Sequence, residues 1–203
     1  PEACTHDNED KVFMLEDDSL NIFIWSTIIA RYLTSYVLQN PANWMVFSNT
    51  HQRLYLGYGN GKITYFDINS TKAIEEHFTT LATAVLGIVD AGHYLFAADR
   101  SGAWNTHYSY NKDGELVDSV DWRNISNEYE WNSLTDRIYH FRDGTSPNDI
   151  EWTELDQSTG EFGGNGDSPF HGGTLKVLAP LVNSSDNQLL LNGGGQLLDA
   201  YSL

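Results

Sequence analysis

Residues 53–67 read RLYLGYGNGKITYFD. Two short segments rich in aromatic and β-branched side chains flank the turn Gly59-Asn60-Gly61. Glycine adopts the positive φ angles that tight hairpin turns need, and the flanking segments have the composition that is typical of strands. The stretch therefore predicts a strand, a tight hairpin and a second strand.

The same pattern recurs along the chain. Similar hairpins are predicted around turns at 99–102, 143–147 and 193–195, and a weaker copy turns at 26–27. One glycine marks each of the four stronger turns: Gly61, Gly102, Gly144 and Gly194. Their separations of 41, 42 and 50 residues are near the length of about 40 to 45 residues that a four-stranded propeller blade has.

An apolar segment precedes each stronger hairpin and is the candidate for the innermost strand of a blade. These segments are 44–47, 84–89, 129–131 and 175–178. Segment 84–89 is apolar throughout rather than alternating, as strands that are covered on both faces are. Further segments, for example 73–78 and 116–122, follow the hairpins as candidate fourth strands.

The predicted fold is all-β, a propeller-like array of about five four-stranded antiparallel blades in a single domain, 1–203. The predicted blades span 12–43, 44–80, 81–123, 124–172 and 173–203. The array is incomplete, because the fifth copy stops within its third strand and the polar segment 5–10 is a poor candidate for a closing strand. We therefore expect further repeats or a partner chain to complete the ring.

Two structural alternatives stay open at this stage. Residues 20–38 carry apolar side chains that fit helical as well as strand spacing, and the alignment with the other repeats favours strands. A β-sandwich or another meander of hairpins is the alternative to the propeller. A long helix at 20–38, or two stacked sheets, would contradict the propeller prediction.

Segments 54–57 and 60–63, together with 94–97 and 101–102, resemble the repeats of bacterial β-propeller proteins of the YVTN and quinoprotein-like kind. The resemblance covers most of residues 12–203, and no WD dipeptide signature is present. It implies a noncatalytic binding or scaffold module of a bacterial envelope or secreted protein. It also implies an extracytoplasmic location, in the periplasm, at the cell surface or outside the cell.

Two other classes of function remain alternatives. A propeller enzyme would be a quinone-dependent oxidoreductase or a metal-dependent hydrolase or lactonase, and a lectin-like domain would bind carbohydrate. We predict no catalytic residue, because no nucleophile motif accompanies His171-Gly172-Gly173 and because segment 57–62 lacks the pattern of a phosphate-binding loop.

Charge and apolar content limit the partners. The chain has 28 acidic and 11 basic side chains and a formal net charge of −17, which argues against a nucleic acid or an anionic membrane surface as partner. No apolar run approaches the roughly 20 residues of a membrane-spanning helix, so we expect no membrane insertion. The single cysteine, Cys4, cannot form an internal disulfide and receives no role. A protein or a carbohydrate ligand is the partner class that remains.

In a propeller, the hairpins between second and third strands and the connections between blades gather on one face. The predicted ligand-binding residues of that face are Asn60, Asp99, Arg100, Trp104, Trp122, Arg142 and Asp143. Aromatic rings beside carboxylate, amide and guanidinium groups suit a polar, planar or sugar-like ligand. The alternative is structural: these polar groups satisfy turn backbones and pair between blades, and the tryptophans pack between sheets.

Residues 143–175 contain seven acidic side chains and no lysine or arginine. Such a region could bind Ca²⁺ through oxygen ligands, and a solvated acidic surface is the alternative. The seven histidines show no paired spacing typical of zinc sites, so a zinc site would have to combine residues of separate repeats. The composition favours the solvated surface, so the cofactor stays unassigned with Ca²⁺ as the candidate that the acidic residues suggest, and no particular metal ligand is predicted.

Overall fold

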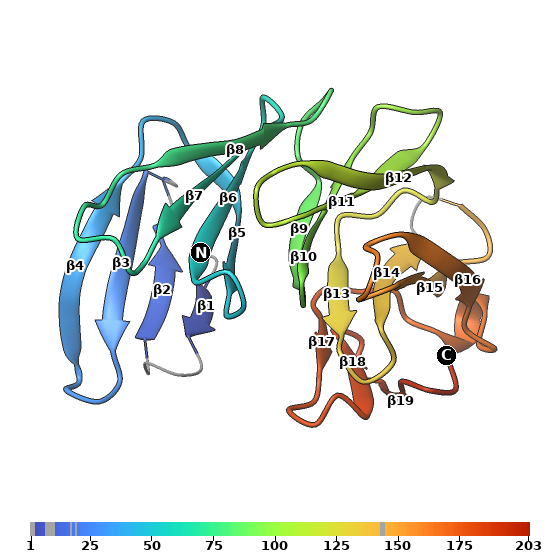
Figure 1. Cartoon of the computed structure of the whole chain (residues 1–203). Helices are drawn as coiled ribbons and strands as arrows, with labels where there is room; N and C mark the ends of the chain where they lie inside the picture. The colour runs from blue at the N-terminus through green and yellow to red at the C-terminus, as the bar shows by residue number, and fades with distance from the viewer. Residues whose placement is uncertain (1–2, 7–10, 17, 19, 143–144) are drawn as a thin grey trace.

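The computed structural model describes residues 3–6, 11–16, 18, 20–142 and 145–203. These residues form five antiparallel sheets, which follow one another along the chain like the blades of a propeller (Figure 1). The prediction of an all-β propeller with five blades is confirmed. Four blades have four strands and the fifth has three.

Each blade is a simple meander of consecutive strands. Blade 1 contains β1 (Ala3–His6), β2 (Lys11–Leu15), β3 (Asn21–Ser26) and β4 (Arg31–Val37). Blade 2 contains β5 (Ala42–Ser48), β6 (Arg53–Tyr58), β7 (Lys62–Asp67) and β8 (Glu76–Thr80). Blade 3 contains β9 (Gly87–Ala91), β10 (Tyr94–Asp99), β11 (Asn105–Tyr110) and β12 (Leu116–Arg123).

The last two blades are built in the same way. Blade 4 contains β13 (Tyr129–Asn132), β14 (Arg137–Arg142), β15 (Asp149–Leu155) and β16 (Phe162–Asp167). Blade 5 contains β17 (Leu181–Asn183), β18 (Leu189–Asn192) and β19 (Leu197–Asp199), and a short 3-10 helix, η1 (Gly172–Thr174), lies in the connection to it. No helix among the described residues is long and apolar enough to cross a membrane.

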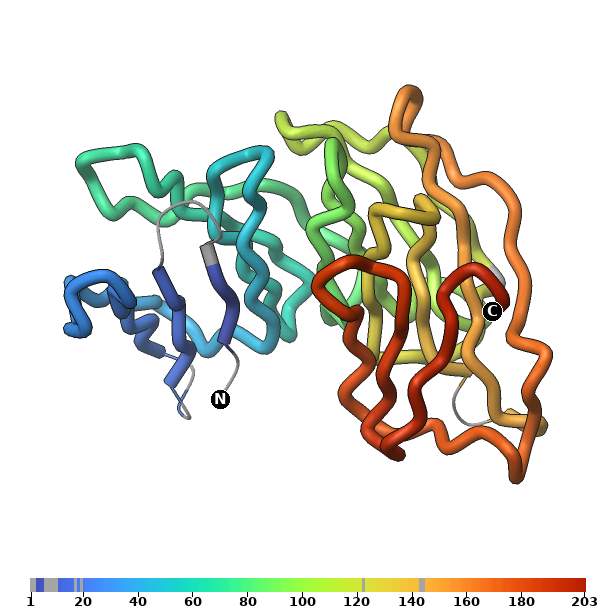
Figure 2. Tube along the Cα trace, turned by 90° about the horizontal axis from the view of Figure 1, so that it is seen from below, coloured from blue at the N-terminus to red at the C-terminus, as the bar shows by residue number. Residues whose placement is uncertain are grey.

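The first strand of each blade contacts the first strand of the next, which places these strands around a common centre. The contacts run from β1 to β5, then to β9, β13 and β17. Figure 2 shows the five blades following one another around that centre. Among the residues that the structure describes, no comparable contact joins β17 to β1.

The hydrophobic core lies between adjacent blades. Side chains alternate along a strand, so neighbouring residues face different blades. Leu54 packs towards blade 1 whereas the next residue, Tyr55, packs towards blade 3. In blade 4, Ile138 faces blade 3 and Tyr139 faces blade 5. This two-sided burial explains the uninterrupted apolar runs in the sequence.

Residues 20–38 form strands rather than a helix, as the repeat alignment predicted. Ile22 and Ile24 are buried between blades 1 and 2, whereas Phe23 between them is exposed. This period of two is that of a strand with one covered face. Further apolar side chains of blade 1 are exposed, among them Tyr32 and Val37.

Two strands differ from the prediction. The first blade was predicted to begin at residue 12, yet β1 precedes this position and pairs with β2 from Ala3 opposite Met14 to His6 opposite Lys11. Backbone hydrogen bonds form this pairing, and Cys4 packs against the core beside it. In blade 5 the first strand is β17 and not 175–178, because Leu175 enters the core as part of the connection while Leu181 begins the paired strand.

Candidate functional site

The residues predicted to bind a ligand lie at separate hairpins. Asn60 and Arg100 are exposed, Trp104 and Arg142 are half-buried, and Asp99 is fully buried. Among the described residues, no hydrogen bond or ion pair joins these five side chains to one another. Asp143 and the side chain of Trp122 lie outside the described residues.

Asp99 is bonded entirely within the fold. Its carboxylate accepts hydrogen bonds from the backbone N–H of Thr83 at 3.0 Å, from the backbone and hydroxyl of Ser101 at 3.1 and 2.6 Å, and from the Tyr108 hydroxyl at 3.0 Å. These bonds close the turn after β10 and attach it to β11 and to the connection from blade 2. The geometry gives Asp99 a structural role.

Replacement of Asp99 by alanine should lower the free energy of unfolding by about 2 to 4 kcal/mol, since it removes four hydrogen bonds that a fully buried carboxylate accepts and leaves a cavity in its place. Chemical denaturation of the purified protein measures this change. Asp156→Ala is the matched control, because Asp156 accepts similar turn bonds from Ser158 and Thr159 at an exposed site. Equal stability of the two variants would contradict the structural role.

A polar pocket of about 330 Å³ lies where blade 4 meets the outer strand of blade 3. The residues that line it are Arg123, Asn124, His140, Glu151, Trp152, Thr153, Asn165, Gly166 and Asp167. Arg123 ends β12 of blade 3, and the others from His140 onward belong to β14, β15 and β16. Strands β12 and β16 are also in contact.

The register of blade 4 explains which side chains meet in the pocket. His140 lies opposite Glu151, and Glu151 lies opposite Asp167, so the three form a row across the sheet. Ile138 is two residues from His140 and packs towards blade 3, which places the row on the same face. Trp152 has the opposite orientation, since its ring packs with the core shared with blade 5.

Glu151 is the centre of the charged contacts. The side-chain amide of Asn124 donates a hydrogen bond of 2.6 Å to Glu151, and the Arg142 guanidinium lies 3.7 Å from the same oxygen. Burial raises the pKa of Glu151, and the contacts with Asn124 and Arg142 reduce this rise. Burial lowers the pKa of Arg123, and the negative charge of Glu151 reduces this decrease. The predicted residue Arg142 thus contacts the pocket through Glu151.

Four residues that line the pocket carry buried polar atoms that have no hydrogen-bond partner. These atoms are Nε of Arg123, both ring nitrogens of His140, Nε1 of Trp152 and Oγ1 of Thr153. A buried polar atom without a partner costs about 1 to 3 kcal/mol, so such atoms are rare in folded proteins. Because these atoms come from two blades and gather in one pocket, the pocket is the candidate ligand site of the described residues.

A second histidine lies behind the pocket. The ring centroids of His107, in β11, and His140 are 5.1 Å apart, and both nitrogens of His107 also lack a partner. Burial lowers the pKa of His140 to about 4, with a further contribution from Arg123. Burial is the main cause that lowers the pKa of His107 well below the ordinary range, and positive charge on His140 or Arg123 lowers this pKa further. Both rings are therefore neutral in the folded protein near neutral pH.

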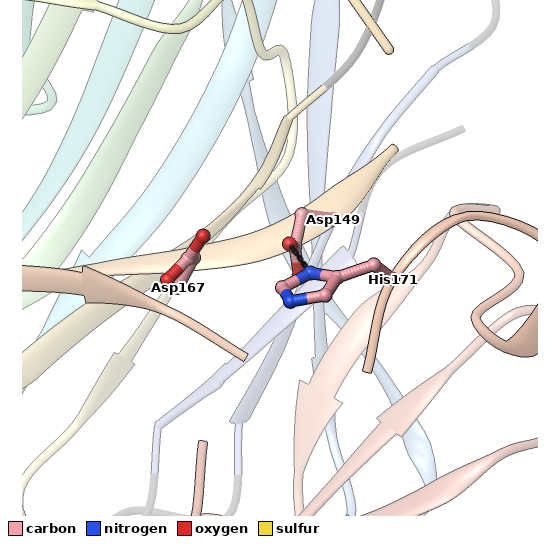
Figure 3. Close-up of side chains that lie close together, drawn as sticks. All are labelled: Asp149, Asp167 and His171. Atoms are coloured by element: carbon pink, nitrogen blue, oxygen red, sulfur yellow. Dashed lines mark hydrogen bonds and ion pairs between the residues drawn. The ribbon is translucent and has the colours of Figure 1, made fainter. Parts of the chain in front are cut away.

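Asp149, Asp167 and His171 form a second cluster at the edge of the pocket (Figure 3). Asp149 is fully buried, and its carboxylate accepts a hydrogen bond of 2.6 Å from the Ser168 hydroxyl. The other oxygen of Asp149 lies 2.5 Å from Nδ1 of His171. Each of the three residues offers one ligand atom, and these atoms lie within 4.8 Å of one another.

Sequence reasoning located this region only in part. The acid-rich segment 143–175 includes Asp149, Glu151 and Asp167, whereas His140 and His171 received no role. A signal was present in β15, where Asp149, Glu151 and Thr153 alternate with Ile150 and Trp152. Such an alternation on a middle strand of a blade places the polar side chains towards a neighbouring blade. Which residues they meet there depends on the register of the sheet, which the sequence alone does not give.

No protein-family model matches the sequence, and no curated protein matches it. Solved structures do resemble it. Hydrazine synthase of Kuenenia stuttgartiensis matches with a TM-score of 0.69 and 13% identity over 93% of this chain and 53% of that chain. A nidogen/laminin complex matches with a TM-score of 0.70 and 11% identity over 98% of this chain and 75% of that chain. This chain thus spans about half the length of the hydrazine synthase chain, and at these identities the likeness shows the fold alone.

Proposed function

We propose that the protein is a noncatalytic β-propeller binding module and that the pocket between blades 3 and 4 binds a small polyhydroxylated ligand of the carbohydrate class. The observation that carries the proposal is the set of buried, unpartnered atoms of Arg123, His140 and Thr153. The noncatalytic character and the extracytoplasmic location are part of the proposal and rest on the resemblance to propeller repeats.

The chemistry of the lining favours hydroxyl groups. Arg123 donates hydrogen bonds, whereas the carboxylates of Glu151 and Asp167 accept them. A hydroxyl group both donates and accepts, so a polyhydroxylated ligand satisfies the two kinds of group without a net charge of its own. The net charge of −17 disfavours a strongly anionic ligand.

The pocket also limits the size and the mode of binding. A volume of about 330 Å³ lies at the lower end of ligand sites in proteins, as a single sugar ring requires. The ring of Trp152 is not free for stacking, because the Arg137 guanidinium lies 3.7 Å from its centroid on the other face of the sheet. Hydrogen bonds would therefore provide the recognition.

Titration of the full chain with glucose, galactose, mannose and N-acetylglucosamine, followed by calorimetry, tests the proposal. At least one of these should bind, and Glu151→Gln should weaken that binding roughly 10- to 100-fold, because a half-buried charged acceptor is lost. Glu115→Gln is the control: it removes the same charge from an exposed position, where Asn111 bonds Glu115. Absence of binding by all four sugars, or equal affinity of Glu151→Gln and wild type, would contradict the proposal.

A further inference from the structure

We propose that Asp149, Asp167 and His171 bind a divalent transition-metal ion such as Zn²⁺ at the edge of the blade 4 pocket. The inference goes beyond the proposed function, because it concerns residues that hold an ion whether or not a sugar is bound. It rests on the geometry of the cluster, its charge, its ligand types and its position beside the pocket.

The backbone holds the three side chains together. Asp149 begins β15 and Asp167 ends the adjacent strand β16. After β16, the N–H of Ser168 donates to the carbonyl of Ile150 at 2.9 Å, and the N–H of Gly172 donates to the carbonyl of Asn148 at 3.1 Å. These two bonds bring His171 back over the start of β15, so the cluster does not depend on long flexible side chains.

The local charge favours a cation. Three carboxylates lie together, because Glu151 is two residues from Asp149 on the same face of β15 and lies opposite Asp167 in β16. The neighbouring Arg142 is directed to Thr145, to which its Nε donates at 3.2 Å, and to Glu151. Arg142 lies opposite Asp149 in the sheet, but among the described residues His171 is the basic side chain that pairs with Asp149, and none pairs with Asp167. A divalent ion would offset this excess of negative charge.

The donor set selects the kind of metal. Two carboxylates and one imidazole are ligands that Zn²⁺ and similar ions accept in sites with three protein ligands and an open position. Ca²⁺ prefers six to eight oxygen ligands, so the histidine favours Zn²⁺ over the Ca²⁺ that the acidic composition suggested. All three ligand residues belong to blade 4 and its exit, not to separate repeats.

An independent observation points to an occupant at this place. Asp167 lines the pocket in one row with Glu151 and His140, and His140 is 1% exposed with both ring nitrogens unpartnered. An ion held by Asp167 would therefore lie beside this pocket. A metal-bound water or a ligand hydroxyl there could supply hydrogen bonds that the protein does not.

Native mass spectrometry and calorimetry of the metal-free full chain, with Zn²⁺ and Ca²⁺ as separate probes, test the inference. We expect one Zn²⁺ per chain, bound at least 10-fold more tightly than Ca²⁺, and a rise of the melting temperature with Zn²⁺. His171→Ala and Asp167→Asn should each weaken Zn²⁺ binding at least 10-fold. His93→Ala, at an exposed histidine of blade 3, should leave it unchanged.

Several outcomes would overturn the inference: no stoichiometric Zn²⁺ binding, tighter binding of Ca²⁺ than of Zn²⁺, or unchanged binding by both ligand variants. Substitution of the buried Asp149 is avoided because it would also disturb the bond to Ser168. The failure of this inference is distinguishable from that of the proposed function, since sugar binding is measured on the same metal-free protein and depends on Glu151.

Discussion

Alanine in place of Gly61 should lower the free energy of unfolding by about 3 kcal/mol or more. Gly61 has a φ of +84°, and an alanine Cβ there would lie 2.6 Å from the carbonyl oxygens of both Leu81 and Thr83. These oxygens belong to the backbone that connects blade 2 to blade 3, so no side chain can rotate away. The N–H of Leu81 also donates to the Gly61 carbonyl at 2.9 Å. Urea denaturation measures the loss.

Gly173→Ala is the matched control for this substitution. Gly173 lacks a positive φ, and an added Cβ would meet no atom within 4 Å. Its effect should remain within about 0.5 kcal/mol, as surface substitutions usually do. If Gly61→Ala were no more destabilising than Gly173→Ala, the close approach of the β6–β7 hairpin to the next blade would be contradicted.

His140 should make the protein less stable in acid. Its pKa is about 4 in the folded protein and near 6.5 in an unfolded chain. Below 6.5 the unfolded chain binds a proton that the buried ring does not, so stability is lost as the pH falls from 6.5 towards 4. This single group should cost about 2 kcal/mol between pH 7 and pH 5.

The total pH profile combines this loss with opposite contributions. Burial raises the pKa of Asp90 to about 6. As the pH falls, Asp90 therefore binds a proton in the folded protein at a higher pH than in the unfolded chain, which adds to the free energy of unfolding. The diagnostic quantity is therefore the difference between wild type and His140→Leu, which should lose about 2 kcal/mol less between pH 7 and pH 5. His93→Leu serves as an exposed control. Parallel profiles of wild type and His140→Leu would show that His140 is not buried in its neutral form.

The propeller was predictable because each blade has a local sequence pattern, in which two apolar segments flank a turn that contains glycine. The turn glycine Gly61 sits in the β6–β7 hairpin as expected, and strands with two covered faces require apolar neighbours such as Leu54 and Tyr55. The sequence did not predict β1, because this strand is held by backbone hydrogen bonds to β2 and has few apolar side chains that would reveal it. Among the described side chains of this strand, Cys4 packs against the core, whereas Ala3 and Thr5 are exposed.

The pocket could not be predicted in the same way. Arg123 and Glu151 approach each other from different blades, and their meeting depends on how blade 3 packs on blade 4. The turn at Asp99 was recognised from its sequence, but its burial depends on Thr83 and Tyr108, which belong to another blade connection and another strand. Local patterns thus specify blades and turns, whereas the site arises from contacts between them.

The most direct test of the binding site is the imidazole NMR spectrum of His140 during titration with the sugar that binds. The assignment comes from the signals that His140→Leu lacks among those of the seven histidines. We predict that the signals of the His140 ring nitrogens shift as the pocket fills, because a ligand hydroxyl forms a hydrogen bond with the ring, while the signals of the exposed His93 stay unchanged. A saturable binding curve that leaves the His140 signals in place would contradict a ligand site between blades 3 and 4.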